Sequence, residues 1–341
     1  MKKLLIPLLL LAALLPMGAN AKKQMMFGVA FYNLENLFDT IPNNPLGRDI
    51  EFTPEGANQW DGKKYWSKIK NLSYVISKMT TPYTPDGPAV IGCSEIENIT
   101  VLQDLVKADA IKQWDLQVIH HDSPDLRGVD VGLLYNPKLF KPIRTTNHTL
   151  DIGYPTRDQM CVVGLLGGNH RTAIIVNHWP SRRGGEKESS PNREAAAALT
   201  RHICDSLYNV DPNMGIIIMG DLNDDPSNKS VAKVLGAVKN IKDCKEGGYF
   251  NPFWKMLDKG IGSYMYRGGW DLFDQIIVNY NLVKGLNGLE YKNCKVWNDQ
   301  YLLQQDGQYK GYPLRTFSGG KWLNGFSDHL PTEIFLVTDV D

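Results

Sequence analysis

The sequence predicts a layered α/β sandwich. Short runs of large apolar residues, typical of strands buried on both faces, recur along the chain, and helical segments lie between them. The chain has 341 residues, of which 43% are hydrophobic and 22% charged, so it can bury a sizeable core in one large domain or two small ones.

The amino-terminal segment predicts a secretory signal peptide over residues 1–21. Two lysines precede an apolar run over residues 4–15, and Ala21 ends a small-residue cleavage site. An uncleaved anchor is the alternative, but the run is short for a membrane span of about 20 residues. We therefore expect an exported protein, periplasmic or secreted, without stable membrane insertion after cleavage. Residues 22–341 would form its domain.

The charges are almost balanced. The first 21 residues hold two of the 37 basic residues and none of the 37 acidic ones, which leaves 35 basic residues against 37 acidic ones. Sequence-blind binding to long nucleic acid needs a basic face, so acidic faces must balance any such face here.

The five cysteines are widely spaced and form no zinc pattern. Export permits a disulfide, for which we favour Cys244 and Cys294, and an odd count leaves one thiol unpaired. Cys93 lies in an apolar run and is expected to be a small buried residue. The other two are Cys161 and Cys204.

Residues 25–32 predict a first strand that runs into Asn33, a residue that alone would be read as a turn former. Residues 41–61 are rich in Pro, Asn and Gly and predict a loop. Residues 63–79 predict an amphipathic helix, because their apolar residues follow helical spacing. These residues are Trp66, Ile69, Leu72, Val75 and Ile76.

A second apolar strand ends at Glu95, which is followed by a helix predicted over residues 100–108. A helix-start acid is the plainer interpretation of such a residue, and Glu97 fits that interpretation better. Residues 117–121 and 129–135 predict two further strands. Arg127, in the loop between them, could contact a phosphate or simply be solvated.

A hairpin is predicted from residues 161–166 and 172–176, joined by a tight turn. Its second strand leads to His178 and to a basic, glycine-rich loop at residues 182–185, which suits an anionic substrate. A lone histidine is more often structural, so this motif needs support from other strand ends. A helix is predicted over residues 193–208.

The apolar run at residues 216–219 predicts a buried strand that ends in Gly220 and a polar cluster. Asp221 and Asn223 alternate with Leu222, so both could face one cleft while Leu222 faces the core. A carboxylate and an amide so placed suit the holding of a water and a phosphoryl oxygen. Alone, the motif is more simply a turn that caps the next helix.

The segment that follows is less regular. Residues 231–238 predict a short helix, and residues 247–260 a loop or a poorly defined element. Residues 264–267 and 272–278 predict a pair of strands, with Asp274 inside the second. A buried aspartate needs a partner, either a backbone turn or a charged side chain such as a histidine.

Residues 281–316 are polar and weakly patterned, which predicts an excursion over the surface. Asp328 and His329 then precede a closing strand predicted over residues 332–337. They could supply a metal-type ligand and a general acid or phosphate binder, or form only a polar turn.

Nearly all of these polar residues stand at strand ends, and their order resembles that of the endonuclease/exonuclease/phosphatase family. This is the fold of DNase I, apurinic endonucleases, sphingomyelinases and inositol polyphosphate 5-phosphatases. The resemblance implies a four-layered α/β sandwich, with two mixed β-sheets face to face, helices outside and a catalytic cleft at one edge. The residues that carry it are Asn33, Glu95, His178, Asp221, Asn223, Asp274, Asp328 and His329.

The resemblance implies a divalent metal site. Glu95 corresponds to the family's Mg²⁺ ligand, and Asn33 and Asp328 would complete the metal and phosphate environment. Hard oxygen ligands are what Mg²⁺ or Mn²⁺ prefers.

The resemblance also implies the other roles. Asp221 would orient or deprotonate the attacking water, and Asn223 would contact the phosphoryl group. His329, with Asp274 as its buried partner, would bind the scissile phosphate, to which Asn33 and Arg127 would also contribute. His178 would stabilise the transition state or leaving group.

Three functional hypotheses follow. The first is an exported, metal-dependent phosphodiesterase that acts as a monomer, with a nuclease on DNA or RNA as the favoured form. The second is a phosphatase or phospholipid-head-group hydrolase, which aromatic residues such as Tyr264 and Tyr266 keep open. The third is a non-catalytic surface-binding module. Cys93 and Ser94 stand where many nucleases of the family carry Gln before the metal-binding Glu, which weakens an apurinic-site repair role.

Overall fold

The computed structural model describes residues 23–44 and 47–340. The predicted signal peptide lies outside the described residues. Within the described part of the chain, no helix combines the length and the apolar character that crossing a membrane requires.

One sheet is built from both ends of the chain. Its six strands are β1 (Lys23–Leu37), β2 (Val90–Ile96), β3 (Gln117–His120), β4 (Asp130–Tyr135), β14 (Glu290–Val296) and β17 (Thr332–Val340). They lie in the order β14-β17-β1-β2-β4-β3. Because β1 pairs parallel with β2 and antiparallel with β17, the sheet is mixed.

The second sheet comes from the middle of the chain. Its seven strands are β5 (Phe140–His148), β6 (Gln159–Leu166), β7 (His170–His178), β8 (Gly215–Asp221), β9 (Ala237–Val238), β10 (Tyr249–Phe250) and β13 (Asp274–Asn279). They lie in the order β5-β6-β7-β8-β13-β10-β9. This sheet is also mixed, since β8 pairs parallel with β7 and antiparallel with β13. The predicted hairpin at β6 and β7 is confirmed.

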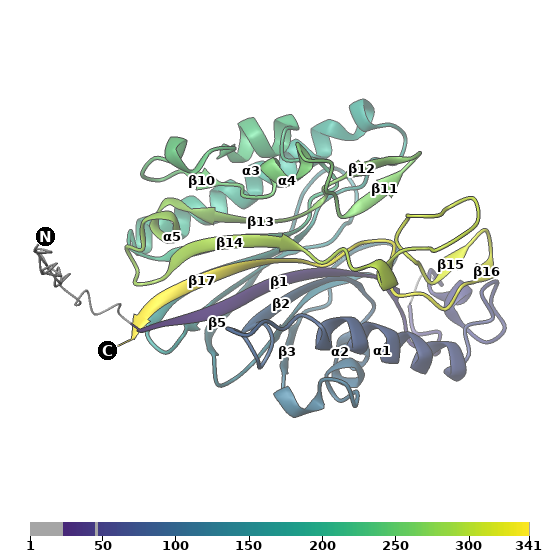
Figure 1. The fold of residues 1–341 in the computed structure, drawn as a ribbon. Coiled ribbons are helices and arrows are strands. Elements are labelled where there is room, and N and C mark those ends of the chain that lie inside the picture. Colours follow the sequence, from purple (N-terminus) through teal and green to yellow (C-terminus); the bar gives the residue numbers. More distant parts are fainter. Residues whose placement is uncertain (1–22, 45–46, 341) are drawn as a thin grey trace, which may run out of the picture.

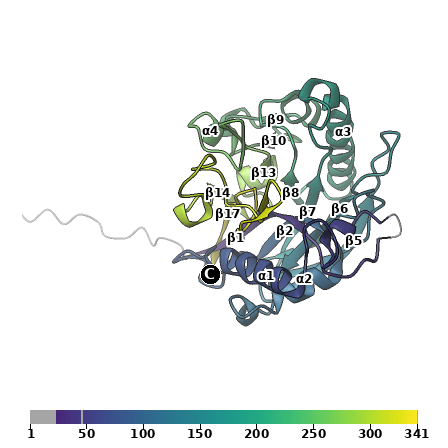
Figure 2. The same cartoon turned by 90° about the vertical axis from the view of Figure 1, so that its right-hand side faces the viewer.

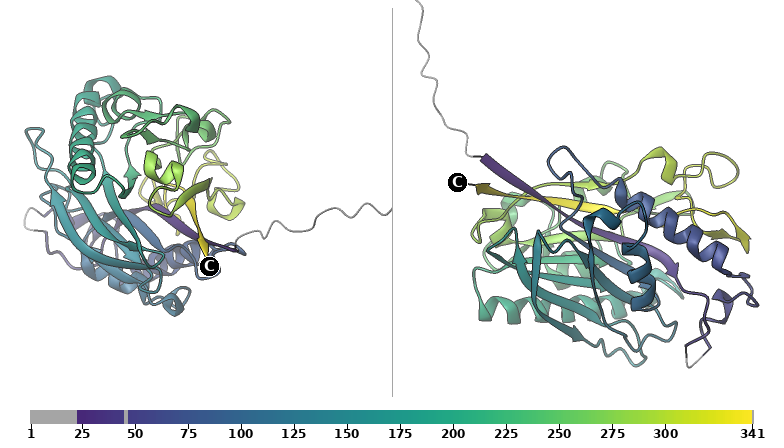
Figure 3. Two further views of the ribbon diagram at one scale, coloured as in Figure 1. Left: turned by 90° about the vertical axis from the view of Figure 1, so that its left-hand side faces the viewer. Right: turned by 90° about the horizontal axis from the view of Figure 1, so that it is seen from below.

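Helices cover the outer faces of both sheets. They are α1 (Gly62–Ser77), α2 (Ile99–Val106), α3 (Glu186–Val210), α4 (Trp254–Leu257) and α5 (Tyr280–Lys284). α1 and α2 lie below the first sheet in Figure 1, and α3 lies above the second. Figure 2 shows the same layers from the side, and the left panel of Figure 3 shows the long teal helix α3 beside the teal strands of the second sheet. The predicted four-layered α/β sandwich of two mixed sheets is therefore confirmed.

The strand β8 shows why its sequence is apolar without a break. Ile217 and Met219 belong to the core between the two sheets, whereas Ile216 and Ile218 belong to the core beneath α3. All four side chains are buried because each face of β8 is covered by another layer.

Helix α1 agrees with the predicted segment at residues 63–79. The side chain of Asp61 caps its first turn by accepting a hydrogen bond of 2.9 Å from the backbone N–H of Lys64. Ile69 and Leu72 are buried against the first sheet, as the spacing predicts. Trp66 was assigned to the same face but is 55% exposed, so this assignment was wrong.

Helix α3 begins at Glu186, seven residues before its predicted start, and contains Pro191. A proline inside a helix removes one backbone hydrogen bond. The fully buried guanidinium of Arg193 holds the residues before this proline, because it donates to the backbone oxygen of Glu186 at 2.9 Å and to Oγ of Ser189 at 2.8 Å. The amino-terminal piece of the helix is therefore held by side-chain bonds.

Two predictions for the last third of the chain were wrong. Residues 264–267 pair not with residues 272–278 but with a shorter segment, in a hairpin of β11 (Tyr264–Tyr266) and β12 (Gly269–Asp271). The surface excursion at residues 281–316 contains part of α5 and the edge strand β14. Residues 247–260, predicted as a loop or a poorly defined element, contain only the short elements β10 and α4.

The remaining small elements are a helix at Ser230–Leu235, where a helix was predicted over residues 231–238, and a ribbon of β15 (Phe317–Ser318) and β16 (Lys321–Trp322). All five cysteines are free, so the proposed pairing of Cys244 with Cys294 was wrong. Sγ of Cys294 instead lies 3.5 Å from Sδ of Met256. Cys93 is fully buried, as expected.

Candidate active site

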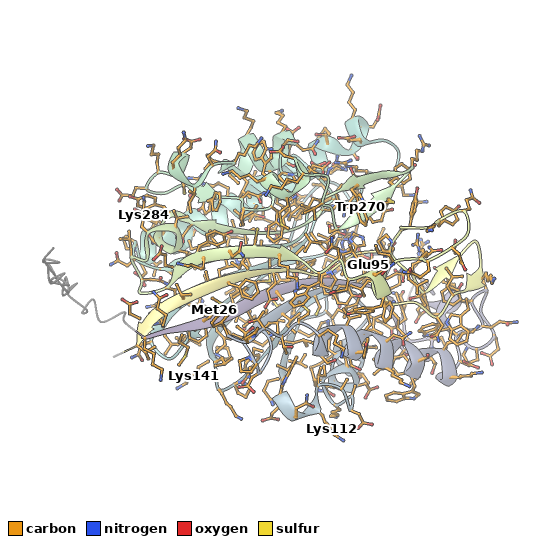
Figure 4. All side chains as sticks on the ribbon, viewed as in Figure 1. Met26, Glu95, Lys112, Lys141, Trp270 and Lys284 are labelled. Atoms are coloured by element: carbon orange, nitrogen blue, oxygen red, sulfur yellow. The ribbon has the colours of Figure 1, made fainter. Side chains whose placement is uncertain are left out.

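A cleft of about 710 Å³ opens at one end of the two sheets. Figure 4 marks Glu95, near the end of β2, and Trp270, on β12, at this end, while Met26 and Lys284 lie toward the opposite end. Most of the predicted site residues line the cleft, namely Glu95, Arg127, His178, Asp221, Asn223, Asp328 and His329. Asn33 and Asp274 lie directly behind its wall, each bonded to a residue that lines it.

Strand pairing explains why these residues meet. In the second sheet, Asp221 of β8 lies opposite His178 on one side and opposite Asp274 on the other. The parallel strands β7 and β8 end where the antiparallel strand β13 begins, so the three side chains share one sheet edge. In the first sheet, Asn33 of β1 lies opposite Ser94, beside Glu95.

Asp221 lies at the centre of the site and is 2% exposed. Its Oδ2 accepts a hydrogen bond of 3.1 Å from Nδ2 of Asn33, and its Oδ1 accepts one of 3.0 Å from the backbone N–H of Asn223. Burial raises the pKa of Asp221 to about 7, although the nearby His329 acts in the opposite direction. A carboxyl group with this pKa can accept a proton near neutral pH.

The backbone turns sharply after β8. A Cβ atom on Gly220 would collide with the carbonyl oxygen of Asn177, so only glycine fits there. Asn223 has a φ of 50°, in the left-handed region, and its Nδ2 donates to the backbone oxygen of Trp179 at 3.0 Å. Leu222 is fully buried, so the alternation of Asp221 and Asn223 toward the cleft agrees with the sequence pattern.

The two histidines of the cleft have opposite charge preferences. Nδ1 of His329 lies 2.7 Å from Oδ2 of Asp274, which also accepts a hydrogen bond of 2.6 Å from Ser263. Burial disfavours the charged form of His329, but Asp274 and Asp221 outweigh it and raise the pKa of His329 well above its usual value.

His178 is buried and has cations as well as carboxylates near it. Burial and then the charge of Arg157 lower the pKa of His178 well below its usual value. Arg157 donates to the backbone oxygens of His178 at 3.2 Å and of Trp179 at 2.7 Å, and so fixes this strand end. Nε2 of His178 lies 3.6 Å from Oδ2 of Asp221. One neutral and one protonated histidine therefore flank the same carboxylate.

Glu95 adopts a φ of 58°, an uncommon conformation for a side-chain-bearing residue that re-aims its carboxylate at the end of β2. Its Oε2 accepts a hydrogen bond of 3.0 Å from the backbone N–H of Asn36. Its Oε1 lies 3.3 Å from Nη2 of Arg127. The pKa of Glu95 is lowered, since Arg127 and His329 outweigh the effect of burial.

Asp328 is held by an arginine that the sequence did not single out. Nη2 of Arg315 donates to Oδ2 of Asp328 at 2.7 Å, and Nε of Arg315 donates to Oε1 of Glu35 at 3.2 Å. Lys68, from α1, lies 3.3 Å from Oε2 of Glu35 and is almost fully buried. Burial and the charge of Glu35 raise the pKa of Asp328 to about 6.

The donor set fits a hard divalent cation. Three carboxylates, on Glu95, Asp221 and Asp328, line one cleft, and oxygen donors of this kind suit Mg²⁺ or Mn²⁺. Ligand atoms of Asp221, Asp274 and His329 lie within 4.8 Å of one another. Asn33 is fully buried, and its Oδ1 accepts from the backbone N–H of Glu35, so its predicted metal or phosphate contact stays a prediction.

Residues 28–338 match the model of the endonuclease/exonuclease/phosphatase family. The chain belongs to this family. No curated protein matches the chain by sequence. Membership supports a phosphoester hydrolase with a nuclease-type fold.

Solved structures agree with the fold of this family member. Humanized D. rerio TDP2 is 12% identical with a TM-score of 0.56, covering 91% of this chain and 98% of that one. A Bacteroides thetaiotaomicron protein of the same family is 16% identical with a TM-score of 0.53, covering 94% and 98%. The human nocturnin catalytic domain with bound sulfate is 13% identical with a TM-score of 0.54, covering 94% and 98%. At such identities the likeness concerns the fold alone.

Several residues of the site were not predicted from the sequence. Glu35 and Lys68 form a buried ion pair, and only the rarity of buried lysines on an apolar helix face could have signalled it. Arg157 lies in a segment without a recognisable pattern. Phe273 was read as part of a strand, yet its ring lies 4.6 Å from the guanidinium carbon of Arg182 in the cleft wall.

Proposed function

We propose that the chain is a divalent-metal-dependent phosphodiesterase that hydrolyses its substrate by in-line attack of water, and that it acts as a nuclease. The observation that carries this proposal is the setting of Asp221. This buried carboxylate contacts Asn33 at 3.1 Å, lies 3.6 Å from His178 and 3.8 Å from His329, and shares its cleft with Glu95.

Asp221 has the position and the pKa, about 7, of a group that orients a water molecule and takes its proton. His329 is held protonated by Asp274, so its Nε2 can donate a hydrogen bond to a phosphoryl oxygen. The amide of Asn223 can donate its second N–H toward the same group. His178, neutral because of burial and Arg157, can stabilise the leaving group without adding charge.

Glu95 and Asp328 are the residues that would hold the cation, with Asn33 behind them. When bound, a divalent cation supplies positive charge that stabilises the negative charge developing on the phosphoryl oxygens. Arg127 and Arg315 hold these two carboxylates in place, which limits the rearrangement that binding requires.

A substrate panel tests this proposal. The chain from residue 22 onward would be incubated with Mg²⁺, with Mn²⁺ or with a chelator, on bis(4-nitrophenyl) phosphate, plasmid DNA, RNA, sphingomyelin and inositol phosphates. We expect turnover of the small diester and of nucleic acid, and its loss with the chelator. Absence of turnover on every phosphoester in the presence of either metal would contradict the proposal.

We also propose that the protein is exported and monomeric, with cleavage after Ala21. The lysines, the apolar run and the small-residue site at residues 1–21 support export. Amino-terminal sequencing of the mature protein from fractionated cells would show a start at Lys22. A start at Met1 in the cytoplasmic fraction would contradict it, and light scattering would give the oligomeric state.

A further inference from the structure

Some charged side chains that line the cleft form ion pairs, and others do not. Three acidic side chains of the cleft have an arginine neighbour: Glu95 lies beside Arg127, Asp328 beside Arg315, and Asp271 lies 3.6 Å from Arg182. Two arginines that also line the cleft have no such match. Among residues 23–44 and 47–340, neither Arg183 nor Arg267 forms an ion pair.

Arg183 differs sharply from its neighbour Arg182. Nε of Arg182 donates to the backbone oxygen of Asn223 at 2.9 Å, and its Nη2 lies 3.4 Å from Oδ2 of Asp225. Arg182 is therefore structural, because its bonds join the loop before α3 to the loop after β8. The side chain of Arg183 is exposed, and no carboxylate of the described residues forms an ion pair with it.

Arg267 occupies the tip of the β11–β12 hairpin. Arg267 and Gly268 have φ values of 49° and 84°, which is the two-residue turn that favours Asn or Gly at its first position. An arginine in this conformation is locally unfavourable, so a role for its side chain is the simplest account of it. Its guanidinium lies 5.1 Å from the ring of Tyr266, and its side chain is exposed.

The same hairpin carries aromatic rings away from the catalytic floor. The ring of Tyr264 lies 4.8 Å from that of His329. Tyr266 lies two residues further along β11, on the same face of the strand, which places it about 7 Å further out. Its ring is 55% exposed within the cleft. A flat group next to the reacting phosphate could therefore stack on Tyr266 while its phosphate meets Arg267.

We propose that Arg183 and Arg267 bind a phosphate next to the scissile one while Tyr266 stacks on a base, so that the enzyme prefers short single-stranded nucleic acid to esters with a cationic head group. This inference rests on the proposed phosphodiesterase function. It assigns the residues that would determine the substrate class. Arginines without an acidic partner beside the site would repel the positive charge of a phosphocholine head group.

The test compares two substrates for each variant of the chain from residue 22 onward, in Mg²⁺. An eight-nucleotide single strand offers neighbouring phosphates and bases, whereas bis(4-nitrophenyl) phosphate has no phosphate beside the scissile one. For Arg183→Gln and Arg267→Gln, we expect kcat/KM on the oligonucleotide to fall at least about tenfold more than on the small ester. We expect Tyr266→Ala to lower kcat/KM on the oligonucleotide at an unchanged salt dependence, since it removes a stacking surface but no charge.

Salt dependence gives a readout that a structural role would not change. Each phosphate neutralised on a single strand contributes a slope of about −0.7 to log(kcat/KM) against log[salt], so each arginine variant should have a shallower slope, and Arg183→Gln/Arg267→Gln together should make it shallower by about 0.7. Arg144→Gln, on the exposed edge strand β5 outside the cleft, is the matched control and should change neither value.

The outcomes separate the two proposals. If the wild-type protein cleaves the small ester but the arginine variants lose equal activity on both substrates at an unchanged salt slope, the inference is wrong and the proposed function stands. Preference of the wild-type protein for sphingomyelin vesicles over the oligonucleotide would also overturn the inference. If the wild-type protein cleaves neither substrate, the proposed function fails as well.

Discussion

Nδ1 of His329 lies 2.7 Å from Oδ2 of Asp274, while Nε2 of the same ring faces Oδ2 of Asp221 at 3.8 Å. One buried imidazole thus joins a carboxylate behind the cleft to one inside it. Asp274 is bonded in turn to the hydroxyl of Ser263, which fixes its orientation.

This relationship predicts that Asp274→Asn lowers the pKa of His329. Removing the largest favourable charge leaves only Asp221 and Asp328 to oppose the effect of burial, so the imidazole should lose its proton at a lower pH than in the wild-type protein. The loss of the orienting charge should reduce kcat by about 10²-fold or more. NMR titration of the His329 ring would measure the pKa, and Asp211→Asn, at the surface end of α3, is the control. An unchanged titration would show that Asp274 does not set the charge of His329.

We expect that breaking the ion pair between Lys68 and Glu35 strongly lowers the free energy of unfolding. The side chains of Lys68 and Glu35 are 1% and 6% exposed, so Lys68→Met would break a buried ion pair and leave Glu35 only the more exposed Arg315 as a cationic partner. Breaking a buried pair in this way costs about 3–5 kcal/mol in the free energy of unfolding. Urea denaturation would measure this loss. Lys229→Met removes the cation of the exposed pair with Glu194 and should cost less than about 1 kcal/mol.

We expect the buried carboxyl group of Glu333 to make the stability of the protein depend on pH. It is fully buried on β17 beside Trp297, and burial raises its pKa to about 8. Its pKa in the unfolded chain is about 4.3, so between these values the folded state binds one proton more than the unfolded state. Stability therefore falls as pH rises through this window, by up to about 1.4 kcal/mol per pH unit. Glu333→Gln should flatten this fall in denaturation curves, and an unchanged slope would contradict it.

Because all five cysteines are free, we expect each of them to react with a thiol reagent once the protein is unfolded. Titration of the unfolded protein with a thiol reagent, without reductant, should give five equivalents. Three equivalents would indicate one disulfide and would contradict the five free thiols.

Residues could be predicted where the local sequence pattern reflects the burial of the side chains in the fold. The strand at residues 216–219 was recognisable because both of its faces are buried, and Asp221 and Asn223 because polar residues follow it directly. The pairing of Asp274 with a histidine followed from the cost of burying an unpaired carboxylate.

What could not be predicted depends on tertiary contacts. The edge strand β14 was not recognised because a register shift between Tyr291 and Asn293 interrupts the alternation of its side chains. The start of α3 was misplaced because Arg193 stabilises a turn that Pro191 would otherwise disrupt. The role of Arg315 as partner of Asp328 depends on segments that meet only in the fold.

The most direct test of the account is the kcat of Asp221→Asn on bis(4-nitrophenyl) phosphate at saturating Mg²⁺. The amide keeps the shape of the side chain but cannot take a proton from water, so we predict a fall in kcat of about 10³-fold with little change in KM. Circular dichroism would check that the variant is folded. A folded Asp221→Asn protein with wild-type kcat would contradict the central claim that this carboxylate, in this cleft, activates the attacking water.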